Sequence, residues 1–172
     1  MMLKKFYPCR YEGSAYTVPY EHYMGKGIRG VIFDIDNTLV PHGASADRQA
    51  ERLFKQLRTM GMKTCLLSNN KESRVKPFAE QVDSPYIFKG GKPGGKGYER
   101  AMEIMGTDRN STLFVGDQLF TDIYGANRAG IFSILVSPIN PKEEIQIVFK
   151  RYLEKPILYF YKKNKKRTGE RR

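Results

Sequence analysis

The feature that most constrains the fold is an alternation of short apolar runs with segments of helical periodicity. The apolar runs end in polar or turn-forming residues, which is typical of strands buried on both faces of a sheet. Strands that alternate with helices predict an α/β protein, in which helices cover both faces of a mainly parallel sheet in a three-layer sandwich. The predicted strands are five, at residues 28–34, 62–67, 85–88, 112–115 and 131–136.

Helices are predicted between these strands. The clearest is capped by Ser45, follows a three-and-four spacing of apolar residues from Ala50 to Met60, and stops at Gly61. A weaker helix runs to about Val82 and contains Pro77. Two more are predicted around residues 98–105 and 119–129.

The chain of 172 residues with 40% apolar composition is long enough for one core. We therefore expect a single domain over residues 1–172, with an N-terminal extension (1–27), a catalytic core (28–139) and a basic C-terminal helix or tail (140–172). No apolar run reaches the roughly 18 residues that span a bilayer, and the N-terminus does not resemble a secretory signal, which predicts a cytoplasmic protein.

The net charge of +12 is unevenly distributed. Residues 150–172 carry ten Lys or Arg and only two Glu. Such a tail is commonly a solvated arm, but it also suits an anionic membrane surface or a nucleic acid backbone. The apolar and aromatic residues of 145–161, followed by cationic ones, suit peripheral contact of residues 145–172 with the inner face of an anionic membrane. They suit equally well a last helix that packs on the sheet and ends in a frayed tail.

Acidic side chains follow two of the predicted strands. Asp34 and Asp36 come directly after the first strand, and Asp117 comes after the fourth. Ligands bind at the carboxyl ends of parallel strands, so Asp34 and Asp117 should face each other there if their strands are neighbours. Clustered carboxylates repel unless they share a cation or a proton, and such oxygen ligands suit Mg²⁺. Taken singly, each acid also fits a turn or an N-cap.

A hydroxyl and a lysine follow two further strands. Ser68 follows the second strand, where its hydroxyl and the next amides can hold phosphate oxygens, although an isolated serine more often caps a helix. Lys92 and Lys96 lie in a glycine-rich segment after the third strand. We favour Lys92, which precedes a proline, as the phosphate-binding lysine, with Lys96 as the alternative. Asp122 alone would more often be a solvated helix residue or the partner of a lysine.

In this order the residues resemble the four motifs of the haloacid dehalogenase-like (HAD) superfamily of phosphohydrolases. The motifs are matched by residues 33–39 (FDIDNTL), 67–69 (LSN), 91–93 (GKP), and by Gly116-Asp117 together with Asp122. The resemblance covers about residues 28–137 and implies a Rossmann-like, HAD-type fold. Members often insert a cap domain, but 29 residues between Thr38 and Ser68 and 23 between Ser68 and Lys92 leave no room for one.

The resemblance implies a hydrolase that uses Mg²⁺ and forms an aspartyl-phosphate. Asp34 would be the nucleophile, and Asp36 the general acid and base. The metal ligands would be the Asp34 carboxylate, the Asp36 main-chain carbonyl and Asp117. This fits the chemistry, because phosphoryl transfer depends on in-line positioning and on neutralising oxygen charge.

The resemblance also implies a binding site for the transferring phosphoryl group. Thr38, Ser68, Asn69 and Lys92 would form it, with Thr38 also supporting its loop. Asp122 would orient Lys92 or add to the metal shell.

Within the superfamily the chain is most similar to the capless subfamily III phosphatases of the YqeG type, on the blocks that begin at Gly27 and Gly116. That group is similar to phosphatases of phosphatidylglycerophosphate, so that the resemblance implies a phospholipid headgroup as substrate. A soluble phosphometabolite is the alternative within the enzyme class. A nucleic-acid or ribosome-associated binding protein with an inactive cleft is the alternative outside it, and the acids at 34, 36 and 117 argue against it.

Overall fold

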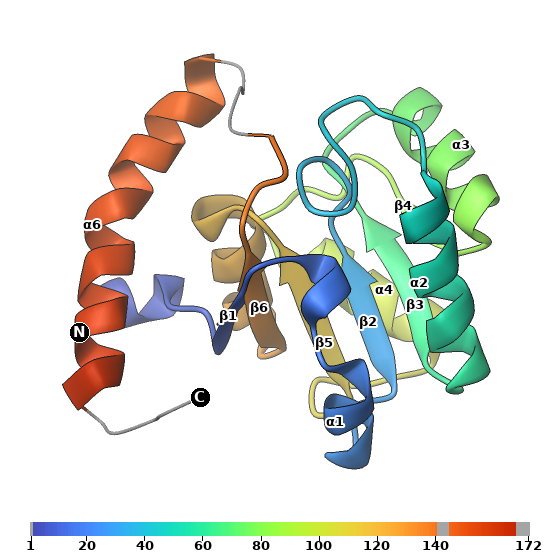
Figure 1. Ribbon diagram of the computed structural model, residues 1–172, viewed down its shortest axis with the longest axis horizontal. Coiled ribbons are helices and arrows are strands. Elements are labelled where there is room, and N and C mark those ends of the chain that lie inside the picture. Colours follow the sequence, from blue (N-terminus) through green and yellow to red (C-terminus); the bar gives the residue numbers. More distant parts are fainter. Residues whose placement is uncertain (1, 141–144, 168–172) are drawn as a thin grey trace.

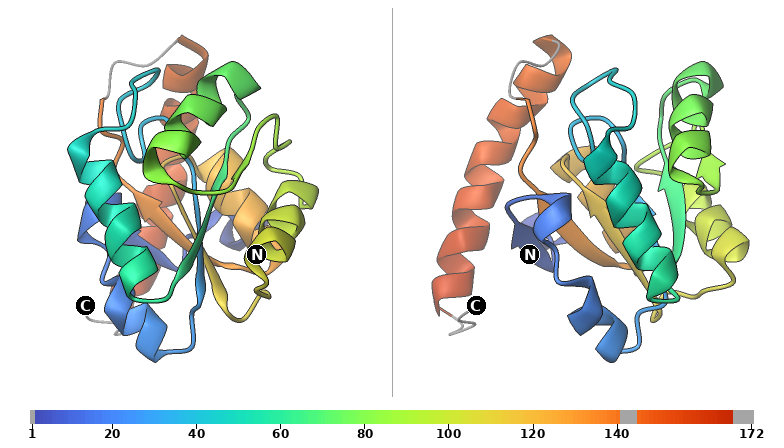
Figure 2. Two further views of the ribbon diagram at one scale, coloured as in Figure 1. Left: turned by 90° about the vertical axis from the view of Figure 1, so that its right-hand side faces the viewer. Right: turned by 45° about the vertical axis from the view of Figure 1, so that its right-hand side comes forward.

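A six-stranded parallel sheet forms the centre of the molecule, with helices on both faces (Figures 1 and 2). The computed structural model describes residues 2–140 and 145–167. The strand order is β1-β6-β5-β2-β3-β4, and every neighbouring pair is parallel. The strands are β1 (Arg10–Glu12), β2 (Gly30–Phe33), β3 (Lys63–Leu67), β4 (Tyr86–Ile87), β5 (Thr112–Gly116) and β6 (Phe132–Val136).

The five predicted strands are confirmed, and the sheet gains one strand that the sequence did not predict. The additional strand, β1, lies in the N-terminal extension and pairs with β6 in the register Arg10↔Ile134. Its three residues, Arg10, Tyr11 and Glu12, are polar or amphipathic and none is fully buried. Such a segment has no apolar run, and only its pairing with a distant strand makes it a strand.

The helices divide between the two faces of the sheet. The side of Phe33 packs against α1, α2 and α3, whereas the side of Ile32 packs against α4 and α5. This division follows from the alternation of side chains along a strand. The helices are α1 (Tyr20–Gly25), α2 (Arg48–Thr59), α3 (Glu72–Val82), α4 (Lys96–Met105), α5 (Tyr124–Ala129) and α6 (Ile145–Arg167), with short turns η1 (Met2–Phe6), η2 (Ala15–Thr17) and η3 (Leu119–Ile123).

The start of α2 differs from the prediction. Asp47, rather than Ser45, is the N-cap, because its Oδ1 accepts hydrogen bonds from the N–H groups of Gln49 at 3.0 Å and Ala50 at 2.8 Å. Both residue types favour this position, so local preference could not separate them. The predicted helix 119–129 is likewise divided, into the π-helical turn η3 and the α-helix α5.

The last helix, α6, lies along the edge of the sheet that β1 and β6 form (Figure 1). Its inner face carries Glu154, Ile157 and Tyr161, which are buried and recur at helical spacing. Ile157 packs with residues of η3 and β6, and the Tyr161 ring lies 5.5 Å from that of Tyr7. Among the described residues, no helix combines the length and the apolar character needed to cross a bilayer.

The sheet order determines which strand ends meet. The central strand β2 lies between β3 and β5, with Phe33 in register with Leu66 on one side and Val115 on the other. The next residue, Asp34, still donates its N–H to the Val115 carbonyl at 3.0 Å. The segments that follow β2, β3 and β5 therefore leave the sheet side by side at its carboxyl edge.

Candidate active site

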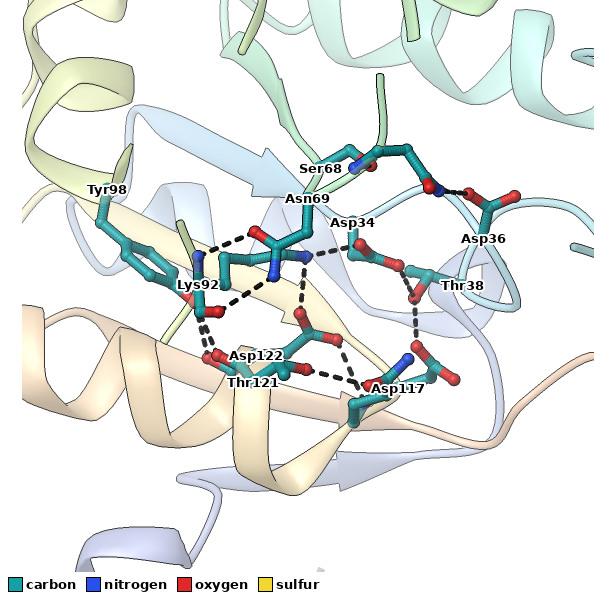
Figure 3. Close-up of polar contacts among 12 residues, drawn as sticks. Asp34, Asp36, Thr38, Ser68, Asn69, Lys92, Tyr98, Asp117, Thr121 and Asp122 are labelled. Atoms are coloured by element: carbon teal, nitrogen blue, oxygen red, sulfur yellow. Dashed lines mark hydrogen bonds and ion pairs between the residues drawn. The ribbon is translucent and has the colours of Figure 1, made fainter. Parts of the chain in front are cut away.

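Three carboxylates meet at the carboxyl edge of the sheet (Figure 3). Asp34 follows β2, Asp117 follows β5, and Asp122 lies in η3. One oxygen of each lies within 4.8 Å of the others, and the three residues are only 8%, 1% and 1% exposed. The structure thus brings together two acids that the sequence places 83 positions apart.

The ammonium group of Lys92 lies inside this cluster. Its Nζ is 2.5 Å from Asp34 Oδ1 and 2.7 Å from Asp122 Oδ1. Lys92 is buried, whereas Lys96, the other candidate, is exposed at the first residue of α4. Lys92, and not Lys96, is therefore the buried cation that lies between the two carboxylates.

The hydroxyl of Thr38 lies between the carboxylates of Asp34 and Asp117. Its Oγ1 is 3.1 Å from Asp34 Oδ2 and 3.2 Å from Asp117 Oδ1, and the residue is completely buried. A hydroxyl has one proton to donate, so it cannot satisfy both carboxylates at once. A cation near these oxygens would offset the repulsion between Asp34 and Asp117 when both are ionised.

The protonation of the cluster reflects its burial. Burial raises the pKa of Asp34 to about 6, opposed by the Lys92 ammonium and reinforced by Asp122. Burial lowers the pKa of Lys92, but the carboxylates of Asp122 and Asp34 outweigh it and hold that pKa above its ordinary value. Lys92 is therefore a permanent cation, and a further cation beside Asp34 would favour its carboxylate form.

The main chain of Lys92 is held by Asn69. The Asn69 side chain accepts a hydrogen bond from the Lys92 N–H at 2.8 Å and donates one to its carbonyl at 2.9 Å. Both polar ends of the Asn69 amide are used in this way. The neighbouring Ser68 is buried, and its Oγ accepts a hydrogen bond from the Asn70 N–H at 3.1 Å.

Asp36 lies apart from the three clustered carboxylates, and its side chain has partners of its own (Figure 3). Its Oδ1 accepts two hydrogen bonds from the Arg74 guanidinium, at 2.9 Å from Nη2 and 3.2 Å from Nε, and one from the Gly43 N–H at 2.8 Å. Its Oδ2 accepts one from the Asn70 side chain at 2.7 Å. The sequence did not single out Arg74, which lies in the first turn of α3, or Asn70, which directly follows the motif at residues 67–69.

Asp122 is supported by close packing on β5 and η3. Its Oδ2 accepts a hydrogen bond from the Gln118 N–H at 3.1 Å, and the hydroxyl of Tyr98 donates to the carbonyls of Thr121 and Asp122 at 3.1 and 3.0 Å. A Cβ at Gly116 would lie only 2.6 Å from Asp122 Oδ2. Gly116 is therefore required for the carboxylate to lie where it does.

The donor set of this cluster fits a divalent cation. The three buried carboxylates and the one ammonium carry a net charge of −2 when all are ionised, and carboxylate oxygens are the ligands of hard cations such as Mg²⁺. Both oxygens of Asp122 already have partners, Lys92 and the Gln118 N–H. Both oxygens of Asp34 also have partners, Lys92 and Thr38, so hydrogen bonding alone does not rank the carboxylates as metal ligands.

Comparison with known proteins identifies the family. Residues 45–130, half of the chain, match the model of the haloacid dehalogenase-like hydrolases. This chain belongs to that family. The matched segment contains Ser68, Lys92, Asp117 and Asp122, and the first motif with Asp34 and Asp36 lies just before it.

Two curated relatives agree with the assignment. The chain is 36% identical to a Bacillus subtilis protein described as "Probable phosphatase YqeG" over 159 residues, which are 91% of this chain and 92% of the relative. It is 28% identical over 142 residues to the Arabidopsis thaliana chloroplastic/mitochondrial phosphatidylglycerophosphate phosphatase 1. These residues are 76% of this chain but only 40% of the plant protein. The chain is accordingly a HAD phosphatase, an enzyme that acts on phosphate monoesters.

Solved structures show the same fold at low identity. A Legionella pneumophila protein described as a HAD superfamily (subfamily III A) hydrolase aligns with a TM-score of 0.54 at 18% identity, over 72% of this chain and 76% of its own. The cobalt-bound deoxy-D-mannose-octulosonate 8-phosphate phosphatase of Haemophilus influenzae aligns with a TM-score of 0.50 at 14% identity, over 66% of this chain and 80% of its own. The predicted HAD-type sandwich without a cap domain is confirmed.

The packing at Gly116 gives a first test of the site. We expect Gly116→Ala to displace the Asp122 carboxylate, because the added methyl group overlaps with it, and to lower turnover of 4-nitrophenyl phosphate by about tenfold or more. Gly13→Ala is the matched control, since its Cβ would meet nothing within 4 Å. Equal activity of the two variants would show that the position of Asp122 does not matter for catalysis.

Proposed function

We propose that this HAD phosphatase hydrolyses phosphate monoesters with Mg²⁺, through an aspartyl-phosphate formed on Asp34. The observation that carries the proposal is the placement of the Asp34 carboxylate between the Lys92 ammonium and the Thr38 hydroxyl, which also contacts Asp117. A carboxylate held between a cation and a fixed hydroxyl is directed toward a phosphoryl group, whose oxygens those same groups can bind.

The proposed reaction has two steps. A carboxylate oxygen of Asp34 forms a bond to phosphorus as the bond to the leaving alkoxide breaks, and Asp36 gives that alkoxide a proton. A water molecule, which loses a proton to Asp36, then attacks the phosphorus of the aspartyl-phosphate. Inorganic phosphate leaves and the Asp34 carboxylate is restored.

The remaining site residues bind and position the phosphoryl group in this proposal. The Lys92 ammonium, the Ser68 hydroxyl and the Thr38 hydroxyl neutralise or hydrogen-bond its equatorial oxygens. Asn69 fixes the main chain of Lys92 with both ends of its amide, which makes it a positioning residue rather than the direct substrate ligand that the motif suggested. Asp122 orients the Lys92 ammonium.

Asp34, Asp117 and the main-chain carbonyl of Asp36 would hold Mg²⁺. Bound there, the ion would offset the charge of the clustered carboxylates and of the phosphoryl oxygens that approach them. Asp122 is the alternative third ligand, since its carboxylate belongs to the same cluster.

Arg74 would act through Asp36. Its two hydrogen bonds, with those from Asn70 and the Gly43 N–H, hold the Asp36 carboxylate in one orientation at the edge of the site. In the proposed reaction the Asp36 carboxylate loses some of these hydrogen bonds each time it turns toward the leaving oxygen. The strength of the ion pair with Arg74 would thus set how readily the acid reaches its target.

We further propose that the substrate is a phospholipid headgroup phosphate such as that of phosphatidylglycerophosphate. The plant relative carries this substrate in its name. The solvent face of α6 supports it, because Tyr152, Leu153, Tyr159 and Phe160 form an exposed stripe with i, i+7 spacing, beside the cations Lys155 and Lys163. A site without a cap also admits a headgroup at a surface. A soluble phosphate ester remains the alternative substrate.

This proposal implies a cytoplasmic enzyme at the inner face of a membrane. The α6 stripe is suited to lie in the interface, where aromatic side chains enter the headgroup region and lysines meet anionic lipids. The inner face of α6 is tied to the active site, because Glu154 Oε1 accepts a hydrogen bond from the Leu119 N–H at 2.9 Å. Point changes on the outer face are for this reason a cleaner test than deletion of the helix.

The nucleophile provides the decisive test of the enzyme class. Asp34→Asn removes the attacking carboxylate, so turnover of 4-nitrophenyl phosphate with Mg²⁺ should fall by about a thousandfold or more, with no phosphoenzyme in acid-quenched samples. The control is Asp83→Asn, which changes an exposed acid outside the cluster. Mg²⁺ should raise the melting temperature of the wild type by more than it raises that of Asp117→Asn. An Asp34→Asn variant with normal turnover would exclude the mechanism.

The role of Arg74 can be separated from general stability by a double-mutant cycle. Arg74→Ala should lower kcat by about tenfold, and Arg74→Lys by less, since lysine keeps the charge but not the paired hydrogen bonds. In an Asp36→Asn background, Arg74→Ala should have little further effect, because the group on which it acts is already gone. Additive losses in the double variant would show that Arg74 works independently of Asp36.

The substrate proposal is tested at a membrane surface. The double variant Tyr159→Ser, Phe160→Ser should bind anionic vesicles about tenfold more weakly and hydrolyse vesicle-borne phosphatidylglycerophosphate more slowly, while it keeps its turnover of 4-nitrophenyl phosphate. Ile104→Ser removes a comparably exposed apolar side chain from α4 and is the control. Equal or faster hydrolysis of glycerol 3-phosphate by the wild type would favour a soluble substrate.

A further inference from the structure

A large cavity lies at the edge of the sheet opposite to the active site. It has a volume of about 850 Å³ and is lined by the N-terminal segment, α1, the loop before β5, and the segment from α5 to the start of β6. These are the amino ends of the strands, whereas Asp34 and Asp117 follow their carboxyl ends. The length of β5, five residues or roughly 17 Å, separates the two places.

The charged side chains that line this cavity are all basic. Six Lys or Arg side chains line it, together with His22, and no Asp or Glu does. Two further cavities differ: the charged residues of one are Arg58, Lys63, Asp83 and Glu103, and those of the other are three acids and Arg109. The net charge of the chain alone does not explain the difference. The six cationic residues are Lys4, Lys5, Arg10, Lys26, Arg109 and Arg128.

Specific hydrogen bonds hold the cationic N-terminal segment in place. The Asn127 side chain donates to the main-chain carbonyls of Lys5 and Tyr7, both at 2.9 Å. The Ser133 hydroxyl donates to Asn127 Oδ1 at 2.7 Å and accepts from the Cys9 N–H at 3.2 Å. The N-terminal extension thus carries its cations to a defined position beside those of the core.

Two of these cations share one aromatic ring. Lys5 Nζ lies 5.3 Å and Arg128 Cζ 5.6 Å from the ring centroid of Tyr124. Neither has a carboxylate of the described residues within 4.0 Å, and both side chains are exposed. Like charges gathered around a concave surface repel one another and raise its positive potential, so a bound anion would be stabilised there.

The inner wall of the cavity has another character. The rings of Tyr7, Tyr124 and Phe132 are half-buried there and keep accessible surface, whereas Tyr23, Ile28 and Ile131 are buried. An apolar and aromatic wall suits an organic group, and the volume is in the range of small-ligand sites. Phosphate groups suit the exposed cations at the opening.

We propose that this cavity binds an organic polyphosphate of the nucleoside di- or triphosphate class. The phosphates contact the cations at the opening, foremost Lys5 and Arg128, and the organic group packs on the half-buried rings of Tyr7 and Phe132. This site is distinct from the catalytic one and does not depend on the substrate proposed above.

The test uses ATP as the probe, in EDTA and at fixed salt, with the Asp34→Asn variant so that no turnover occurs. Calorimetry should show saturable binding to one site, weakened by at least tenfold in Arg128→Glu and in Lys5→Glu. Lys55→Glu makes the same charge change on the exposed face of α2, outside the cavity, and should bind as the parent does. Unchanged melting temperatures establish that the variants are folded.

Three results would overturn the proposal. The first is an absence of saturable binding, and the second is an equal loss of affinity in Lys55→Glu, which would make the effect one of net charge. The third is that another anion binds as tightly as ATP or more tightly. Inorganic triphosphate with such affinity would leave the apolar wall without a role, and a ten-nucleotide single strand with such affinity would make the partner a nucleic acid. Tighter binding of ATP than of adenosine or triphosphate supports it.

Discussion

The structure depends on the burial of three carboxylates around a single ammonium group. Asp34, Asp117 and Asp122 are almost fully buried, and Lys92 is the cation that lies among them. Removing such groups from water is costly, and the surrounding structure must offset the cost with fixed donors and a tight scaffold. Gly116, the Asn69 amide and the Tyr98 hydroxyl provide that scaffold. The sheet order, which places β2 between β3 and β5, makes the cluster geometrically possible.

Much of the fold could be read from the sequence because apolar runs buried on two faces have an unmistakable pattern. The five runs from 28–34 to 131–136 all became strands. The strand β1 could not be predicted, since Arg10, Tyr11 and Glu12 have no pattern of their own and become extended only by pairing with β6. The cap of α2 was misassigned by two positions for a similar reason, because Ser45 and Asp47 have nearly equal intrinsic preference.

The residues of the site likewise divide into those that a local sequence pattern predicts and those that depend on tertiary packing. Residues at strand ends, such as Asp34, Asp117 and Lys92, were predictable because parallel strands place their ends together. Arg74 lies in the first turn of α3, and Glu154 lies in a helix that follows the core, so their contacts with Asp36 and with the Leu119 N–H depend on packing that no local pattern encodes. Asn69 was recognised from its motif, but its contact with the main chain of Lys92 only became visible in three dimensions.

The pairing of β1 with β6 has a consequence for how the chain is made. Arg10 pairs with Ile134, so β1 leaves the ribosome more than a hundred residues before its partner strand β6. The core strands β2, β3 and β5 can associate earlier, because all of them are complete before β6 appears. The edge strand β1 and the cations that flank it would therefore be added to the sheet only after β6 has been made.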